Sequence, residues 1–168
     1  MDLREIQKPL KERYREDPDA SQITLRADGS VGEDVMSCSV DLGRAVQAAE
    51  AHTGVGGAGT AACSGDLLLG ALAACAQLTC QMVATATGLE ANRIEAKVEG
   101  DLDLRGTLGV DKEVPAGFSA IRLRFEIDAP EATREELDGL IARTERYCTV
   151  LQTLSQPPPI EVSVDLQS

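Results

Sequence analysis

The sequence has few aromatic residues, with no Trp, two Phe and two Tyr among its 168 residues. Its core must therefore be built from Leu, Val, Ile and Ala, a composition that suits helices packed on strands. A chain of this length can bury one core but rarely two independent ones. We expect a single domain over residues 1–168, with residues 1–16 as an N-terminal helical extension.

Basic charge is also scarce. The chain has 16 Lys and Arg against 28 Asp and Glu, which gives a formal net charge of −12. A surface that binds nucleic acid needs a net positive footprint. We therefore expect no DNA or RNA partner.

No segment has the composition of a membrane span or a secretory signal. The most apolar stretch, residues 67–86, approaches spanning length but contains Gln77 and Gln81 and is rich in Ala. Residues 2–11 are too rich in charge for the apolar part of a signal peptide. We expect a cytoplasmic protein without membrane association.

Cofactor and metal motifs are absent or lack their context. Gly54, Gly56 and Gly59 match the G-x-G-x-x-G pattern of dinucleotide binding, which must follow a strand. Residues 44–51 are Ala-rich and look helical, and no βαβ unit surrounds the motif, so we predict a flexible loop. No Gly-Lys-Ser/Thr follows, no cysteine pair has C-x-x-C spacing, and His52 is the only histidine. We expect no cofactor and no metal.

The apolar pattern predicts strands separated by two principal helices. Strands are expected at residues 22–27, 36–42, 93–104, 121–127 and 160–166, with a turn at 28–29. Helices are expected at residues 2–15, 66–87 and 133–147, the second capped by Ser64 and Gly88 and the third begun by the capping box at Thr133. This order indicates an α+β fold with mostly antiparallel sheets.

The helix over residues 66–87 is apolar nearly all round, so it should lie in the centre of the structure. The predicted strands of one chain provide too little surface to cover it. A second subunit that shares the core is the simplest way to cover it, so we predict a homodimer.

The five cysteines are an odd number in a chain large enough to fold without disulfides. Reduced thiols, some of them reactive, fit this pattern better than a disulfide framework. Three of them, Cys38, Cys63 and Cys80, are readily explained by packing, because free cysteine is among the most buried residue types. Cys38 is expected on the inward face of its strand, and Cys80 is expected to point away from Cys75.

Two cysteine segments together resemble the OsmC/Ohr family. Residues 65–75 read GDLLLGALAAC, similar to the family's helix "P-x-E-L-L-x-A-A-L-x-x-C", and residues 145–150 read ERYCTV. In that family a second cysteine follows some 60 to 75 positions later, and Cys148 follows Cys75 by 73. The resemblance extends over residues 22–166. It implies an intertwined homodimer in which two long central helices are enclosed by antiparallel sheets.

The resemblance also implies a chemistry, the reduction of organic hydroperoxides. Cys75 would attack the peroxide as a thiolate and become a sulfenic acid. Cys148 would then condense with it to a disulfide, which a dithiol reductant reopens. The apolar neighbours of Cys75 favour alkyl or lipid peroxides over hydrogen peroxide.

The residues that support the thiol differ from the family pattern. Family members pair the thiol with an Arg from a "G-G-R-x-G" loop and a Glu ten positions before it. Here the acidic residue is Asp66, nine positions before Cys75, and a straight helix would place it on the opposite side. Asp66 is equally well explained as an N-terminal helix charge. Arg26 and Arg44 lie in the right part of the chain, and either could instead be a surface charge.

Two alternatives to the peroxidase remain open. One is a non-enzymatic OsmC-like protein that binds a small apolar ligand in the dimer core. The other is a hydrolase in which His52 serves as the base for Cys75. The simpler interpretation of His52 is a solvent-exposed loop residue.

Overall fold

The computed structural model describes residues 5, 7, 16, 17, 22, 24, 28–31, 37–41 and 46–166. Within them a three-stranded sheet contains β1 (Asp28–Val31), β2 (Ser37–Asp41) and β3 (Val46–Glu50), and a hairpin contains β4 (Arg93–Asp101) and β5 (Ala120–Asp128). The helices are η2 (Thr53–Val55), α2 (Ser64–Thr87), α3 (Leu104–Thr107), α4 (Arg134–Tyr147) and α5 (Thr149–Ser155). All three strand pairings are antiparallel, which confirms the predicted α+β class.

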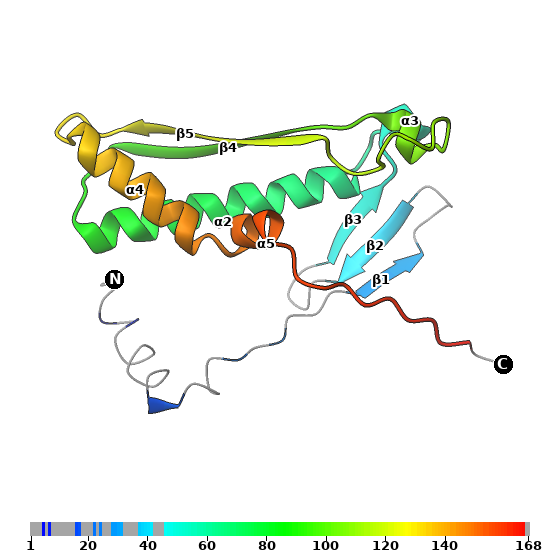
Figure 1. Cartoon of the computed structure of the whole chain (residues 1–168), viewed down its shortest axis with the longest axis horizontal. Coiled ribbons are helices and arrows are strands. Elements are labelled where there is room, and N and C mark those ends of the chain that lie inside the picture. Colours follow the sequence, from blue (N-terminus) through cyan, green and yellow to red (C-terminus); the bar gives the residue numbers. More distant parts are fainter. Residues whose placement is uncertain are drawn as a thin grey trace.

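The long helix α2 lies along one face of the β4–β5 hairpin, and α4 and α5 pack beside it (Figure 1). Its ends follow from local chemistry. The Asp66 carboxylate accepts a hydrogen bond from the backbone N–H of Cys63 at 2.9 Å, which makes Cys63 the N-cap, one residue before the predicted Ser64. The helix ends at Gly88, whose φ of 74° lies in the left-handed region that favours glycine.

The predicted elements after residue 64 largely match the structure. Thr133 and Glu136 form the predicted capping box at the start of α4. In β5 the apolar side chains at 121, 123, 125 and 127 alternate with charged ones, as predicted. The strand predicted over 93–104 ends at Asp101, because the Asp103 side chain accepts the N–H of Arg105 at 3.0 Å and begins the short helix α3.

The core consists of two clusters along α2. One contains Cys80, Val83, Ala84 and Leu140, with Phe125 and Ile127 of β5 packed against it. The other contains Leu72, Ala76 and Cys148. The described residues leave much of the opposite face of α2 uncovered, since Leu78 is 59% exposed and Met82, whose sulfur accepts a hydrogen bond from Gln7, 41%. Most of the packing on α2 by this part of the chain is therefore on one side of the helix.

The segment over residues 44–51, predicted to be helical, is a strand where the structure describes it. Residues Val46–Glu50 form β3 and pair with β2, so sheet pairing overrides the helix preference of the alanines. Residues 28–29, predicted to form a turn, begin β1. The glycine pattern therefore does follow a strand, but that strand is antiparallel to its neighbour. Gly56 and Gly59 have φ of 98° and 78° and serve the turns of this loop.

The predicted strand over residues 160–166 is also wrong for the single chain. This segment has no secondary structure, and Ile160, Val162, Val164 and Leu166 are 78–92% exposed. Its alternating pattern suits a strand, but a strand needs a neighbouring edge to bond its backbone. The helix predicted over 2–15 and the strand predicted over 22–27 lie mostly outside the described residues.

By length and composition alone, α2 could cross a membrane, a test that the core helix of a soluble protein also passes. Its packing explains the composition, because Leu72, Ala76 and Val83 are buried against the hairpin and the other helices. We therefore interpret α2 as a core helix.

Gln77 joins α2 to the edge of β4 that faces away from β5, where no described strand pairs. Its side-chain amide donates to the carbonyl of Ile94 at 2.7 Å and accepts the N–H of Ala96 at 2.8 Å. A further strand would otherwise bond these two backbone groups. The Gln77 side chain bonds both of them and so fixes the position of α2 relative to the hairpin.

The Gln77→Ala variant should lose about 2 kcal/mol of unfolding free energy, because two partly buried backbone groups lose their partner. Denaturant unfolding followed by circular dichroism measures this loss. Gln81→Ala, one helical turn further on, is the control and should change stability by less than about 0.5 kcal/mol. Equal effects of the two variants would contradict a specific role for Gln77.

Candidate active site

Cys75 and Cys148, the two cysteines singled out by the sequence, are neighbours in the structure. Cys75 lies in the middle of α2, and Cys148 is the single residue between α4 and α5, where it caps α5. Cys148 is fully buried against Leu72 and Ala76, the α2 residues on either side of Cys75. Cys75 packs against the same cluster, and the two thiols are close enough for each to shift the pKa of the other. Both are free thiols here.

The surroundings of Cys75 favour a thiolate. Burial raises the pKa of Cys75, but four hydrogen bonds to its sulfur act in the other direction and prevail, so the net pKa lies below the ordinary value of a thiol. The donors are the N–H groups of Val150 and Thr149, the Cys148 thiol and the Thr79 hydroxyl. The two N–H groups belong to the first turn of α5, where they have no partner within the helix.

Cys148 is shifted the opposite way. Burial raises the pKa of its thiol, and the neighbouring Cys75 sulfur raises it further, while N–H groups of Leu151 and Val150 only partly oppose them. The two cysteines are therefore unequal. Cys75 is the one that ionises, and Cys148 keeps its proton and donates it to the Cys75 sulfur.

The pair lies in an apolar environment. Side chains from β4, β5 and α5 pack around it, namely Ala96, Val98, Ile121, Leu123, Phe125, Val150, Leu151 and Leu154. No charged side chain of the described residues contributes to the shift of Cys75. Hydrogen bonds rather than a cation stabilise its thiolate within this part of the chain.

Asp66, the predicted acidic partner, lies at the start of α2 and is exposed. Nine residues of helix separate it from Cys75 by about 14 Å along the axis. Its pKa is lowered because it accepts the N–H of Cys63. One chain does not bring Asp66 to Cys75. Arg26 and Arg44 lie outside the described residues, and their roles stay predictions.

His52 is also separate from Cys75. It lines a cavity at the N-terminal end of α2 together with Cys63, and Cys75 is not part of that lining. Within one chain the structure does not assemble the Cys75/His52 hydrolase. His52 is exposed, as the simpler interpretation expected.

The remaining cysteines differ in burial. Cys80 is fully buried in the other core cluster, points away from Cys75 as expected, and burial raises the pKa of its thiol. Cys63 is half-buried. Cys38 lies in β2, and its side chain is outside what the structure describes. Among the described residues no group of three or more His, Cys, Asp or Glu is placed to hold a metal ion.

Thr79 is a site residue that the sequence did not reveal. It is 6% exposed and follows Cys75 by one helical turn. Thr85, Thr87, Thr144 and Thr153 each donate to the carbonyl four residues earlier, the usual arrangement for threonine inside a helix. The hydroxyl of Thr79 instead reaches the Cys75 sulfur.

Comparison with known proteins identifies the family. Residues 57–163 match the model of the OsmC-like protein family, which covers more than half of the chain. This protein therefore belongs to the OsmC-like family, as the two cysteine segments indicated. No curated protein sequence matches it significantly.

Several solved structures share the fold. An OsmC-like protein from Mycoplasma pneumoniae is 21% identical with a TM-score of 0.67, over 81% of this chain and 90% of that one. An organic hydroperoxide resistance protein OsmC from Legionella pneumophila is 18% identical with a TM-score of 0.61, over 81% and 92%. The organic hydroperoxide resistance protein OhrB of Bacillus subtilis is 17% identical with a TM-score of 0.51, over 80% and 93%.

Alkylation by iodoacetamide should distinguish the two thiols, because only thiolates react. Since the pKa of Cys75 is lowered and that of Cys148 raised, the rate at Cys75 should reach its plateau at lower pH. Thr79→Val removes one donor, raises the pKa of Cys75 and should slow its alkylation at neutral pH by about tenfold, with no change at high pH.

Peptide mass spectrometry over a pH series gives both rates. Thr85→Val is the matched control, because Thr85 is exposed and bonds only a helix carbonyl. If Cys148 reacted at lower pH than Cys75, the assignment of the thiolate would be reversed.

Proposed function

We propose that this protein is a cysteine-dependent peroxidase that reduces organic hydroperoxides. The observation that carries the proposal is the unequal pair, in which a thiol with lowered pKa contacts a thiol with raised pKa. A thiolate is the nucleophile that attacks peroxides, and an adjacent thiol can resolve the product before further oxidation. The names of the Legionella and Bacillus structures support the same chemistry.

The steps balance with the residues of this site and one external reductant. The Cys75 thiolate attacks the terminal peroxide oxygen, the O–O bond breaks, and an alkoxide leaves. The Cys148 thiol is placed to give that alkoxide its proton, which releases an alcohol and leaves Cys148 as a thiolate. This thiolate attacks the sulfur of the Cys75 sulfenic acid, forms a disulfide and expels hydroxide, which becomes water. A dithiol reductant returns two electrons by exchange.

The substrate class follows from the surroundings of the sulfur. The side chains packed around the pair are apolar, so an alkyl or lipid group gains free energy on binding that hydrogen peroxide cannot. We expect organic hydroperoxides to be preferred. Free thiols and dependence on a dithiol also fit a reducing compartment, and we infer a cytoplasmic location.

We further propose that the active form is a homodimer. The exposed apolar side chains of α2 and of residues 160–166 support this, since a second subunit would bury the first and pair with the second. It could also supply the arginine, Arg26 or Arg44, that family members place beside the thiol.

One equivalent of cumene hydroperoxide tests the proposed reaction. We expect a Cys75–Cys148 disulfide within seconds, detected by peptide mapping, and slower formation with hydrogen peroxide. Cys75→Ser should abolish turnover, and Cys80→Ser, remote from the pair, should not. If both thiols stay free, or oxidise no faster than Cys80, the peroxidase is excluded and the non-enzymatic protein that binds an apolar ligand in the dimer core becomes the better hypothesis.

Sedimentation tests the dimer. The wild-type chain should sediment as a dimer, and the double substitution Leu78→Glu with Met82→Glu should give monomers, because charges would be buried unpaired. Glu90→Gln, on the exposed turn after α2, serves as the control and should remain dimeric. A monomeric wild type would contradict the proposal.

A further inference from the structure

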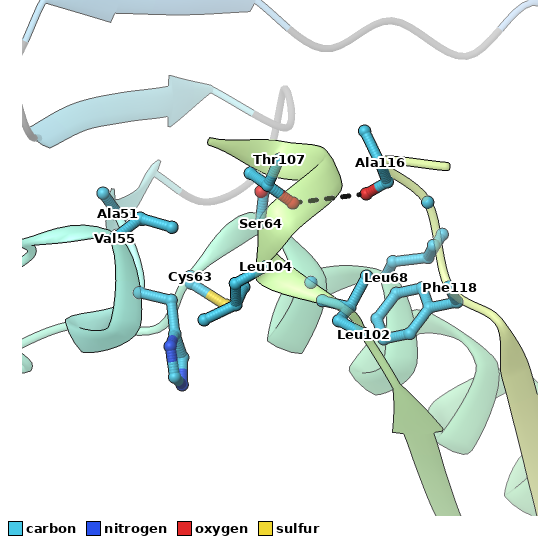
Figure 2. A pocket seen from close by; sticks show the side chains of 13 residues that line it. Ala51, Val55, Cys63, Ser64, Leu68, Leu102, Leu104, Thr107, Ala116 and Phe118 are labelled. Carbon is cyan, nitrogen blue, oxygen red and sulfur yellow. Dashed lines mark hydrogen bonds between the residues drawn. The ribbon is translucent and has the colours of Figure 1, made fainter. Parts of the chain in front are cut away.

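Cys63 lines a cavity at the N-terminal end of α2. The cavity has a volume of about 520 Å³ and lies between η2, the first turns of α2 and the β4–β5 connection. Most of its wall is carbon, from Ala51, Val55, Leu68, Leu102, Leu104, Ala116 and Phe118 (Figure 2). The space is large enough for a small organic molecule.

Few polar or reactive groups line this apolar space, and two of them are the thiol of Cys63 and the imidazole of His52. Cys63 is a free, half-buried thiol that lines the cavity together with Leu104 (Figure 2). His52 lines the same wall, and both residues also line an adjoining cavity of about 230 Å³. The thiol and the imidazole therefore stand where the two spaces meet.

The hydrogen bonding of His52 determines what the imidazole can offer. The backbone N–H of Gly54 donates to Nδ1 at 3.0 Å, so Nδ1 is unprotonated. In the neutral ring the proton must then be on Nε2. His52 is thus a hydrogen-bond donor through Nε2–H, suited to a carbonyl oxygen.

The negative charge of Asp66 further limits which ligands the cavity can bind. Asp66 lines the adjoining cavity, and hydrogen bonding by the N–H and the side chain of Cys63 lowers its pKa, so it is ionised. A carboxylate at this position repels anionic ligands such as fatty acids. A neutral molecule with an apolar body and a carbonyl group meets all three conditions.

We propose that this cavity binds neutral, apolar α,β-unsaturated carbonyl compounds and that Cys63 adds to them. The Cys63 sulfur forms a bond to the β-carbon, the C=C π bond breaks, and the carbonyl oxygen accepts a hydrogen bond from His52 Nε2–H as charge develops on it. The thiol proton ends on the α-carbon, so no oxidant, reductant or third reactant is consumed. The product is a covalent adduct held in the apolar cavity.

Within one chain this site is separate from the peroxidase pair. Cys63 precedes Cys75 by 12 residues of helix, about 18 Å along the axis. Its adduct chemistry neither requires nor consumes the Cys75 thiolate, so either proposal can fail without the other.

The test uses the full-length protein, one equivalent of trans-2-nonenal or trans-2-pentenal, borohydride trapping and peptide mass spectrometry. Each buried methylene should increase the rate by up to about fourfold, so nonenal should label Cys63 faster than pentenal by more than about tenfold. His52→Gln should slow nonenal addition by about tenfold, the effect of one lost hydrogen bond. In this variant, Cys63 should react with iodoacetamide at the wild-type rate, because that reaction does not need the hydrogen-bond donor of His52.

Two further variants separate the cavity from general thiol reactivity. Leu68→Gln places a polar group in the wall and should remove the preference for nonenal, whereas Leu108→Gln, exposed and outside the lining, should retain it. Cys63→Ser should abolish labelling while the peroxide-induced Cys75–Cys148 disulfide still forms. Labelling of Cys75 instead of Cys63, or equal rates for the two aldehydes, would overturn the proposal.

Discussion

In the first turn of α5, the N–H groups of Val150 and Thr149 lower the pKa of Cys75. These groups have no carbonyl partner within their own helix, so a thiolate satisfies them better than a neutral thiol. The same turn places Cys148 against Cys75 as a proton donor. The identity of the nucleophile, the identity of the resolving thiol and the protonation of each follow from this one contact between two helices.

The rest of the fold keeps that contact in place. Gln77, two residues after Cys75, fixes α2 to the edge of β4 through two hydrogen bonds between its side-chain amide and backbone groups of the strand. The capping box at Thr133 sets the start of α4. Leu140, in the middle of α4, is buried against α2. Because α4 leads into α5 through Cys148 alone, the position of α4 determines where the α5 amides point.

Sequence patterns predicted the elements whose ends have strong local signals. Gly88 ends α2 and Thr133 begins α4 because each supplies a specific cap, and the alternation in β5 reflects one buried face. The pattern failed at residues 44–51, where alanine prefers helix but a neighbouring strand offers pairing. It failed at 160–166 because a strand depends on a partner edge that lies outside the local sequence.

The site was predictable only in part for a similar reason. The resemblance to a family pointed to Cys75 and Cys148, but the lowered pKa of Cys75 depends on N–H groups of another helix, α5. Thr79 gave no signal, because a helical threonine normally bonds its own helix. The cavity around Cys63 and His52 depends on the β4–β5 connection, which lies some 40 positions later in the chain and closes it from the side.

The most direct test of this account is to trap the intermediate on Cys75. In the Cys148→Ser variant, oxidation by cumene hydroperoxide should stop at a sulfenic acid, which dimedone labels and mass spectrometry locates. The account predicts the dimedone adduct on Cys75, with Cys63 and Cys80 unlabelled. An adduct on another cysteine, or no adduct at all, would contradict the assignment of Cys75 as the nucleophile.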